Sequence, residues 1–326
     1  MTNRLSFVAR CVGGVLAFAA LGAAHAAEYP TRPLTLVVPY PPGASTDNLA
    51  RAVADELGKE LKQPVVVENK PGAATTIGIM AVKNPPADGY TIMFQTEGLI
   101  VGPYAVKNVD FKRSDFELIS PLARAPFALM APSSIPSDSV EEYFKYARDN
   151  PEKMNYGVLG AGLSIFTLLG DAVTESTGIR WTSVPYKGGM EGIQALMSDQ
   201  IQAYFATVSL ASSQLKQPRL KVIAVADTKR SPYLPDVPTF AEAGYPEIVG
   251  AMLLGLGVRA ETPPEIVEKL KAAMERVRAS ETMKKSIASL SLESYEGSLQ
   301  DYEKDLDELA ELYAAAAKKL EAKAAN

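Results

Sequence analysis

The chain has 326 residues, 47% of them hydrophobic and 22% charged, and its formal net charge is −5 at pH 7. This acidic balance argues against a nucleic-acid partner, which would require a basic face. The single cysteine, Cys11, and the single histidine, His25, both lie at the N-terminus. If that segment is removed, disulfides, thiolate or imidazole metal sites and nucleophile–histidine pairs are all excluded from the mature protein.

Residues 1–26 have the pattern of a secretory signal peptide. Arg4 and Arg10 form a short basic region, an apolar run follows over 12–24, and Ala-His-Ala at 24–26 is a small-x-small cleavage site. The apolar run is too short to span a bilayer comfortably. We therefore expect a protein exported to the periplasm, cleaved near Ala26, whose formal charge falls to −7 because two arginines are lost.

In the first part of the mature chain, short apolar runs alternate with a helical pattern. Leu49, Val53, Leu57 and Leu61 recur every four residues, the stripe of a helix that packs on a sheet. This order predicts βαβ units and an α/β fold with mixed, mainly parallel sheets flanked by helices. The expected strands are 34–40, 64–69, 91–96 and 127–132.

The pattern then starts again, and no Gly/Ser linker separates the two rounds. Strands that cross between two lobes, near 120–130 and 246–256, would therefore form a hinge. The predicted division is lobe 1 over 27–125 plus 247–326, and lobe 2 over 126–246. The remaining expected strands are 154–160, 182–186, 201–207, 220–227 and 253–263, and the expected helices are 164–177, 190–199, 263–280 and 299–323.

The stretch VVPYPPGASTDNLARAVADEL, residues 37–57, runs from a strand through Gly43 into a helix start. The first turn of a helix has four unpaired N–H groups and a partial positive charge, so it attracts anions. The alternative is an ordinary helix start, capped by Ser45 or Thr46 with Asp47 complementing the dipole. Asp47 also counts against a site for a dianion such as phosphate.

A second turn of this kind, NYGVLGAGLSIFTLLGDA, covers 155–172. It lacks the context of a dinucleotide site and the Gly-Lys-Ser/Thr of a Walker loop. Two helix starts, one from each lobe, could together hold a small anion. Lys187 lies in a glycine-rich turn and could meet a ligand carboxylate, although a solvated loop lysine fits equally well.

Enzymatic readings have little support. SQLK at 213–216 matches Ser-x-x-Lys, but no Ser-Asp-Asn, Lys-Thr-Gly or Gly-x-Ser-x-Gly accompanies it. We expect neither an enzyme nor a bound metal or cofactor, and a periplasmic hydrolase is the weakest alternative. The charge pattern EKDLDELAEL at 303–312 indicates a solvated helix face.

Longer stretches resemble the substrate receptors of tripartite tricarboxylate transporters, the Bug family. These are YPTRPLTLVVPYPPGASTDNLARAVADELGKELKQPVVVENKPGAATTIG, PPADGYTIMF, VPYKGG, ALMSDQIQAYF, LKVIAVADTKRSPYLPDVPTFAEAGYP and TPPEIVEKLKAAM, in order along the mature chain. The resemblance implies a two-lobed, type II-like periplasmic binding protein that closes over one small carboxylate and delivers it to membrane transporter subunits. A sensor subunit that presents its ligand to a signalling partner fits the same fold. We expect a monomer.

The resemblance also implies where the ligand binds. Its carboxylate would be held by two loops, one per lobe. The ends of two strands, QTE at 95–97 and ATVS at 206–209, would line the rest of the cleft. The chain departs from the family pattern at Ala206-Thr207 and at Phe166, where the family commonly has polar side chains. It also departs at 252–254, where Met-Leu-Leu stands in place of a common aromatic pair. The lost polar groups predict a ligand less polar than citrate, such as an aromatic or longer-chain carboxylate. The expected ligand-binding residues are Pro42, Gly43, Ala44, Ser45, Thr46, Asp47, Thr96, Gly160, Ala161, Gly162, Leu163, Ser164, Lys187, Ala206 and Thr207.

Overall fold

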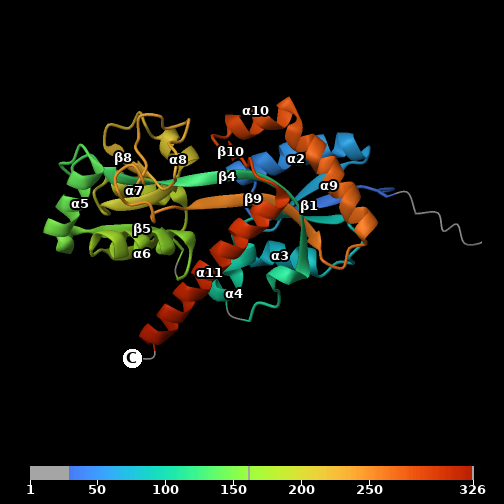
Figure 1. The fold of residues 1–326 in the computed structure, drawn as a ribbon, viewed down its shortest axis with the longest axis horizontal. Coiled ribbons are helices and arrows are strands. Elements are labelled where there is room, and N and C mark those ends of the chain that lie inside the picture. Colours follow the sequence, from blue (N-terminus) through green and yellow to red (C-terminus); the bar gives the residue numbers. More distant parts are fainter. Residues whose placement is uncertain (1–28, 107, 161, 325–326) are drawn as a thin grey trace, which may run out of the picture.

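A computed structural model describes residues 29–106, 108–160 and 162–324, with side chains through 319. The predicted signal peptide and Ala161 lie outside the described residues. Figure 1 shows two lobes side by side, with strands β4 and β9 running from one into the other. No helix in the described part of the chain combines the length and the apolar character needed to cross a membrane.

Lobe 1 is a mixed sheet in the order β2-β1-β3-β9-β4, in which β1 pairs in parallel with β2 and β3. Its two faces carry separate cores, because Leu36 and Val38 of β1 pack into one and Val37 into the other. The elements are β1 Leu34–Val38, α2 Ser45–Leu61, β2 Val65–Asn69, α3 Thr76–Lys83, β3 Thr91–Gln95, α4 Gly98–Ala105, β9 Ala251–Arg259, α9 Pro264–Ala279, α10 Glu281–Ser289 and β10 Glu293–Ser294.

The predicted stripe on α2 is confirmed. Leu49, Val53 and Leu57 are fully buried and Leu61 nearly so, all in the core that α2 shares with α9 and α10. Three fully buried leucine or valine side chains stabilise the fold by roughly 1.5–3 kcal/mol each. This packing fixes the start of α2 at the carboxyl end of β1.

Lobe 2 contains a second mixed sheet, in which β5 pairs in parallel with β6 and β7. Helices cover both of its faces, again with one core on each. The elements are α5 Val140–Asp149, β5 Asn155–Leu159, α6 Ile165–Thr177, β6 Thr182–Tyr186, α7 Gly189–Met197, β7 Ala203–Thr207, α8 Val208–Ser213 and β8 Leu220–Val225.

Strand β4, Phe116–Pro132, belongs to both sheets. Its first part pairs with β9 through Pro126, and from Phe127 onward it pairs with β7 and β8. The sequence predicts a strand over 127–132 and a crossing near 120–130, but not a strand that begins at Phe116. Pro121 does not suit a strand interior, and the pairing with β9 shifts register twice in this part. The chain passes between the sheets at Phe127, whose N–H donates to Gly250 O, so both connecting strands cross at one level.

Helix α11, Leu299–Ala324, begins on lobe 1 and extends along the molecule toward lobe 2 (Figure 1). It packs against α4 and β4. Further along, Leu309 contacts core residues of both lobes. Lys319 Nζ lies 2.7 Å from Glu175 Oε1 of α6. The last helix therefore contacts both lobes.

Candidate functional site

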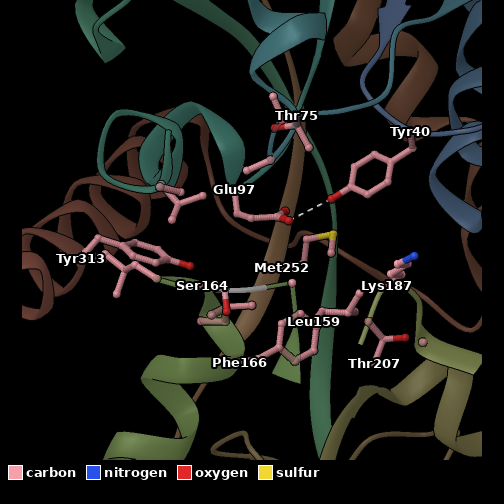
Figure 2. A pocket seen from close by; sticks show the side chains of 18 of the residues that line it. Tyr40, Thr75, Glu97, Leu159, Ser164, Phe166, Lys187, Thr207, Met252 and Tyr313 are labelled. Atoms are coloured by element: carbon pink, nitrogen blue, oxygen red, sulfur yellow. Dashed lines mark hydrogen bonds between the residues drawn. The ribbon is translucent and has the colours of Figure 1, made fainter. Parts of the chain in front are cut away.

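A cavity of about 580 Å³ lies between the two lobes. Its walls come from the carboxyl end of β1, the starts of α3 and α4, the start of α6, the β7–α8 turn and helix α11 (Figure 2). The lining residues are Tyr40, Ala73, Ala74, Thr75, Glu97, Val101, Ala105, Val106, Leu159, Gly160, Leu163, Ser164, Ile165, Phe166, Lys187, Gly189, Tyr204, Ala206, Thr207, Leu210, Met252 and Tyr313.

The turn before α3 is the most strained backbone at the cavity. Ala73, Ala74 and Thr75 have φ angles of 47°, 48° and 69°, so three consecutive non-glycine residues adopt the left-handed conformation. Each costs roughly 1–3 kcal/mol and persists only where the surroundings fix it. Gly98, the first residue of α4, makes room for the turn, because a Cβ there would stand 1.5 Å from Thr75 Oγ1.

Glu97 forms the polar part of the lobe-1 wall. The Tyr40 hydroxyl donates a hydrogen bond of 2.8 Å to Glu97 Oε1, and the two side chains point toward each other in Figure 2. Burial raises the pKa of Glu97, against the lowering effect of the Tyr40 hydrogen bond. Burial raises the pKa of Tyr40 well above its usual value, and the adjacent charge of Glu97 raises it further. Tyr40 therefore stays protonated and acts as a donor.

The lobe-2 wall is built around the start of α6. Ser164 and Thr167 form a capping box, in which Thr167 N donates to Ser164 Oγ at 3.3 Å and Ser164 N donates to Thr167 Oγ1 at 2.9 Å. Ile165 and Phe166, the first two residues of the helix, line the cavity. The positive end of the α6 dipole therefore lies at this wall, where a negative charge is stabilised. The exposed Lys187 adds a positive charge to the same wall.

Four residues that line the cavity each carry one buried polar atom without a hydrogen-bond partner among the described residues. These atoms are Thr75 Oγ1, Glu97 Oε2, Tyr204 Oη and Tyr313 Oη. Both tyrosine side chains are fully buried. An unsatisfied buried polar group costs about 1–3 kcal/mol, so four of them around one cavity indicate a ligand with polar groups. Between them the walls are apolar, from side chains such as Leu159, Phe166 and Met252 (Figure 2).

The first predicted ligand loop does not line this cavity. Asp47 is 1% exposed, and its carboxylate accepts hydrogen bonds from Gly43 N, Asn69 Nδ2 and Arg51 at 2.8–3.1 Å. Neither Ser45 nor Thr46 caps α2, because the N-cap residue is Ala44 and no side chain caps it. Ser45 lines a separate shallow hollow, together with Ser209 and Ser291. The carboxylate of Asp47 therefore lies at the start of α2, and the Pro42–Asp47 segment does not line the cavity between the lobes.

Most residues of the second predicted loop and of the other predicted positions do line the cavity. The cavity brings together Gly160, Leu163, Ser164, Lys187, Ala206 and Thr207. Gly162 lines another cavity on lobe 2 beside Trp181, and the buried Thr96 lines neither. Thr207 also caps α8 by accepting from Leu210 N at 3.3 Å.

The sequence does not predict several cavity-lining residues, among them Tyr40, the strained turn at 73–75, Tyr204 and Tyr313. Tyr40 belongs to the same strand–turn stretch as Asp47, in which the sequence pattern points to the helix start and not to the tyrosine. Tyr313 has a detectable signal, because Tyr302, Leu306, Leu309 and Tyr313 follow one stripe of α11, and all but the partly buried Leu309 are fully buried. The sequence predicts that the charged residues of 303–312 form a solvated face, and this apolar stripe occupies another face of the same helix.

A comparison with known protein families decides the relationship. The profile of the tripartite tricarboxylate transporter family receptor matches residues 49–320. The chain belongs to this family. The resemblance found in the sequence and the two-lobed α/β fold are therefore confirmed, and the family is one of solute receptors, not of enzymes.

Solved structures agree with this assignment. The periplasmic binding protein BugD is 28% identical, with a TM-score of 0.72 over 90% of this chain and 98% of BugD. MatC from Rhodopseudomonas palustris, with bound malate, is 25% identical, with a TM-score of 0.73 over 87% of this chain and 100% of MatC. R. palustris Rpa4515, with adipate, is 29% identical, with a TM-score of 0.75 over 89% and 97%.

Proposed function

We propose that this protein captures one small organic carboxylate in the cavity between its lobes and delivers it to the membrane subunits of a tripartite tricarboxylate-type transporter. The observation that carries the proposal is the cavity itself. Its lobe-2 wall presents the positive end of α6 and Lys187, and four of its lining residues carry a buried polar atom without a partner in the described part of the chain. Family membership and the malate- and adipate-bound neighbours support a carboxylate as the ligand.

Capture would proceed by closure of lobe 2, residues 126–246, onto lobe 1, residues 27–125 and 247–326. The hinge would lie where β4 and β9 pass between the sheets, around Phe127 and Gly250. The carboxylate would meet the start of α6, and closure would bring the lobe-1 hydroxyls against the rest of the ligand. The mature protein would act as a monomer in the periplasm after cleavage near Ala26.

The apolar walls favour a ligand less polar than citrate. Leu159, Phe166 and Met252 offer no hydrogen bonds from their side chains, so a third carboxylate or a hydroxyl against them would lose its water without compensation. A longer-chain or aromatic carboxylate fits this arrangement. Calorimetry that finds tight binding only for small hydroxylated tricarboxylates would overturn this part of the proposal.

A thermal-shift screen of the chain from Ala27 tests the function. The panel contains citrate, malate, adipate, hexanoate and benzoate. At a hundredfold excess over Kd, a bound carboxylate should stabilise the folded protein by about 2.7 kcal/mol. Lys187→Met should weaken binding by about two- to fivefold, more at low salt, since an exposed lysine contributes a screened charge. Lys216→Met, an exposed lysine of lobe 2 outside the cavity lining, is the control. If no carboxylate shifts the unfolding temperature, the proposal fails.

A further inference from the structure

Glu97 places an acid at the lobe-1 end of the cavity, facing the wall that carries α6 and Lys187 (Figure 2). One of its oxygens, Oε1, accepts a hydrogen bond from Tyr40. The other, Oε2, is buried and has no partner among the described residues. Thr75, on the same wall, carries a second unpartnered oxygen. The two ends of the cavity therefore differ: the end with α6 and Lys187 is positive, and the end with Glu97 offers hydrogen-bond acceptors.

We infer that the ligand carries one carboxylate and, at its far end, a hydrogen-bond donor that meets Glu97 Oε2. The inference rests on the proposed function, because it takes the carboxylate at the α6 end as given. It adds the substrate class: a monocarboxylate with a distal hydroxyl, amide or ammonium group, separated from the carboxylate by an apolar segment. Glu97 would then determine specificity between such ligands and dicarboxylates.

Hydrogen-bond arithmetic supports a donor at this position. A carboxylate is an acceptor only, and Tyr40 already supplies a donor to Oε1. Burying Oε2 unpaired costs free energy, which a donor on the ligand would restore. An apolar ligand end would leave the oxygen unsatisfied.

Electrostatics disfavours a second carboxylate there. Two like charges 4 Å apart near a protein surface repel by about 4 kcal/mol, and the alternative is uptake of a proton by one of them. Burial raises the pKa of Glu97, so proton uptake is easier than for an exposed acid, and the affinity for a second carboxylate should fall as the pH rises. The described titratable side chains that line the cavity on the same side as Glu97 are Tyr40, beyond β1, and Tyr313 of α11, both neutral at neutral pH. Neither compensates a second negative charge.

Calorimetry with four six-carbon probes of matched length tests the inference: 6-hydroxyhexanoate, 6-aminohexanoate, hexanoate and adipate, at pH 7.5. In the wild-type protein at least one donor-bearing probe should bind about tenfold tighter than hexanoate and adipate. In Glu97→Gln the preference should reverse toward adipate, because the amide still accepts from Tyr40 and can donate to a carboxylate. Glu268→Gln, an exposed acid of lobe 1 outside the cavity lining, should leave the wild-type ranking unchanged.

The outcomes separate the inference from the function beneath it. If adipate or hexanoate binds the wild-type protein as tightly as both donor-bearing probes, the inference is overturned while carboxylate capture stands. If none of the four binds while citrate, malate or benzoate does, the inference is overturned and carboxylate capture stands; if no carboxylate of either set binds, both fail. The wild-type ranking decides the matter alone if Glu97→Gln does not fold.

Discussion

The starts of α2 and α6 follow the same local plan: a strand, a glycine with positive φ, and then a helix. Gly43 and Gly160 have φ angles of 84° and 72°, and nothing lies within 4 Å of a Cβ built on either. Yet only the α6 start lines the cavity between the lobes. The two starts differ in the side chains of their first turns. At α2 a buried Asp47 binds back to Gly43 N, whereas at α6 the neutral Ser164 and Thr167 cap each other.

We infer from this difference that a carboxylate of the protein itself can take the place of an external anion at a helix start. Asp47 is held by Arg51 and Asn69 as well as by Gly43 N, so its negative charge occupies the positive end of α2. The neutral capping box of α6 satisfies two donors and adds no charge. Three predictions test this distinction.

The largest effect is expected from giving α6 the charge that α2 has. Ser164→Asp keeps a good N-cap residue but places a carboxylate at the cavity wall, where it would repel the ligand. Affinity for the best carboxylate should fall by about 2–4 kcal/mol, roughly 30- to 1,000-fold, with little change in unfolding temperature. Ser164→Asn, a neutral cap, should retain most of the affinity. Ser139→Asp, at the cap of α5 away from the cavity lining, should bind as the wild type does. Equal affinity in Ser164→Asp and Ser164→Asn would place the carboxylate elsewhere.

The second prediction removes the internal anion of α2. Asp47→Ala leaves Gly43 N and Asn69 without their acceptor, so the free energy of unfolding in urea should fall by about 2–3 kcal/mol. Ligand affinity of the folded variant should stay within twofold of the wild type. Asp55→Ala, an exposed acid on the same helix, is the matched control and should change stability little. A large loss of affinity with unchanged stability would assign Asp47 to the ligand after all.

The smallest effect is a pH dependence of that stability difference. Burial acts to raise the pKa of Asp47, but the hydrogen bonds from Arg51, Asn69 and Gly43 outweigh it and the pKa is lowered. A carboxyl whose folded pKa lies below its unfolded value of about 3.9 stabilises the fold above that value and loses this contribution as pH falls through the folded pKa. The stability gap between wild type and Asp47→Ala should therefore be constant from pH 5 to 7 and shrink below pH 4. A gap that grows on acidification would show that the pKa is raised instead.

Much of the fold is predictable from the sequence because its elements obey simple periods. The α2 stripe and the short strands β1, β2, β3 and β5 agree with the structure to within two residues. The first part of β4 is the clearest failure. Pro121 and Arg124 do not suit a buried strand, and it is tertiary context that accommodates them: the register shifts near Pro121, and Arg124 pairs with Asp227 at 2.8 Å. Neither is visible in a local window.

The candidate site was less predictable, for a similar reason. Whether Asp47 faces a ligand depends on Asn69, 22 residues away, which reaches it only after β1 and β2 have paired. Whether Thr75 faces the cavity depends on three consecutive left-handed residues for which the alanines at 73 and 74 give no signal. Residues that meet only after strands far apart in the sequence have paired cannot be predicted from their spacing along the chain.

The position of Tyr313 on α11 has a consequence for the order in which the site can form. A polypeptide is synthesised from its N-terminus, and Tyr313 is the last of the cavity-lining residues to be made. Strand β9, which lies between β3 and β4, also arrives late, after all of lobe 2. A nascent chain can thus complete the lobe-2 sheet beyond the β4 crossing while the cavity still lacks one wall. The cavity is therefore complete only when the chain includes α11. A chain interrupted before α11 would keep the α6 start and Lys187, yet its cavity would be open to water.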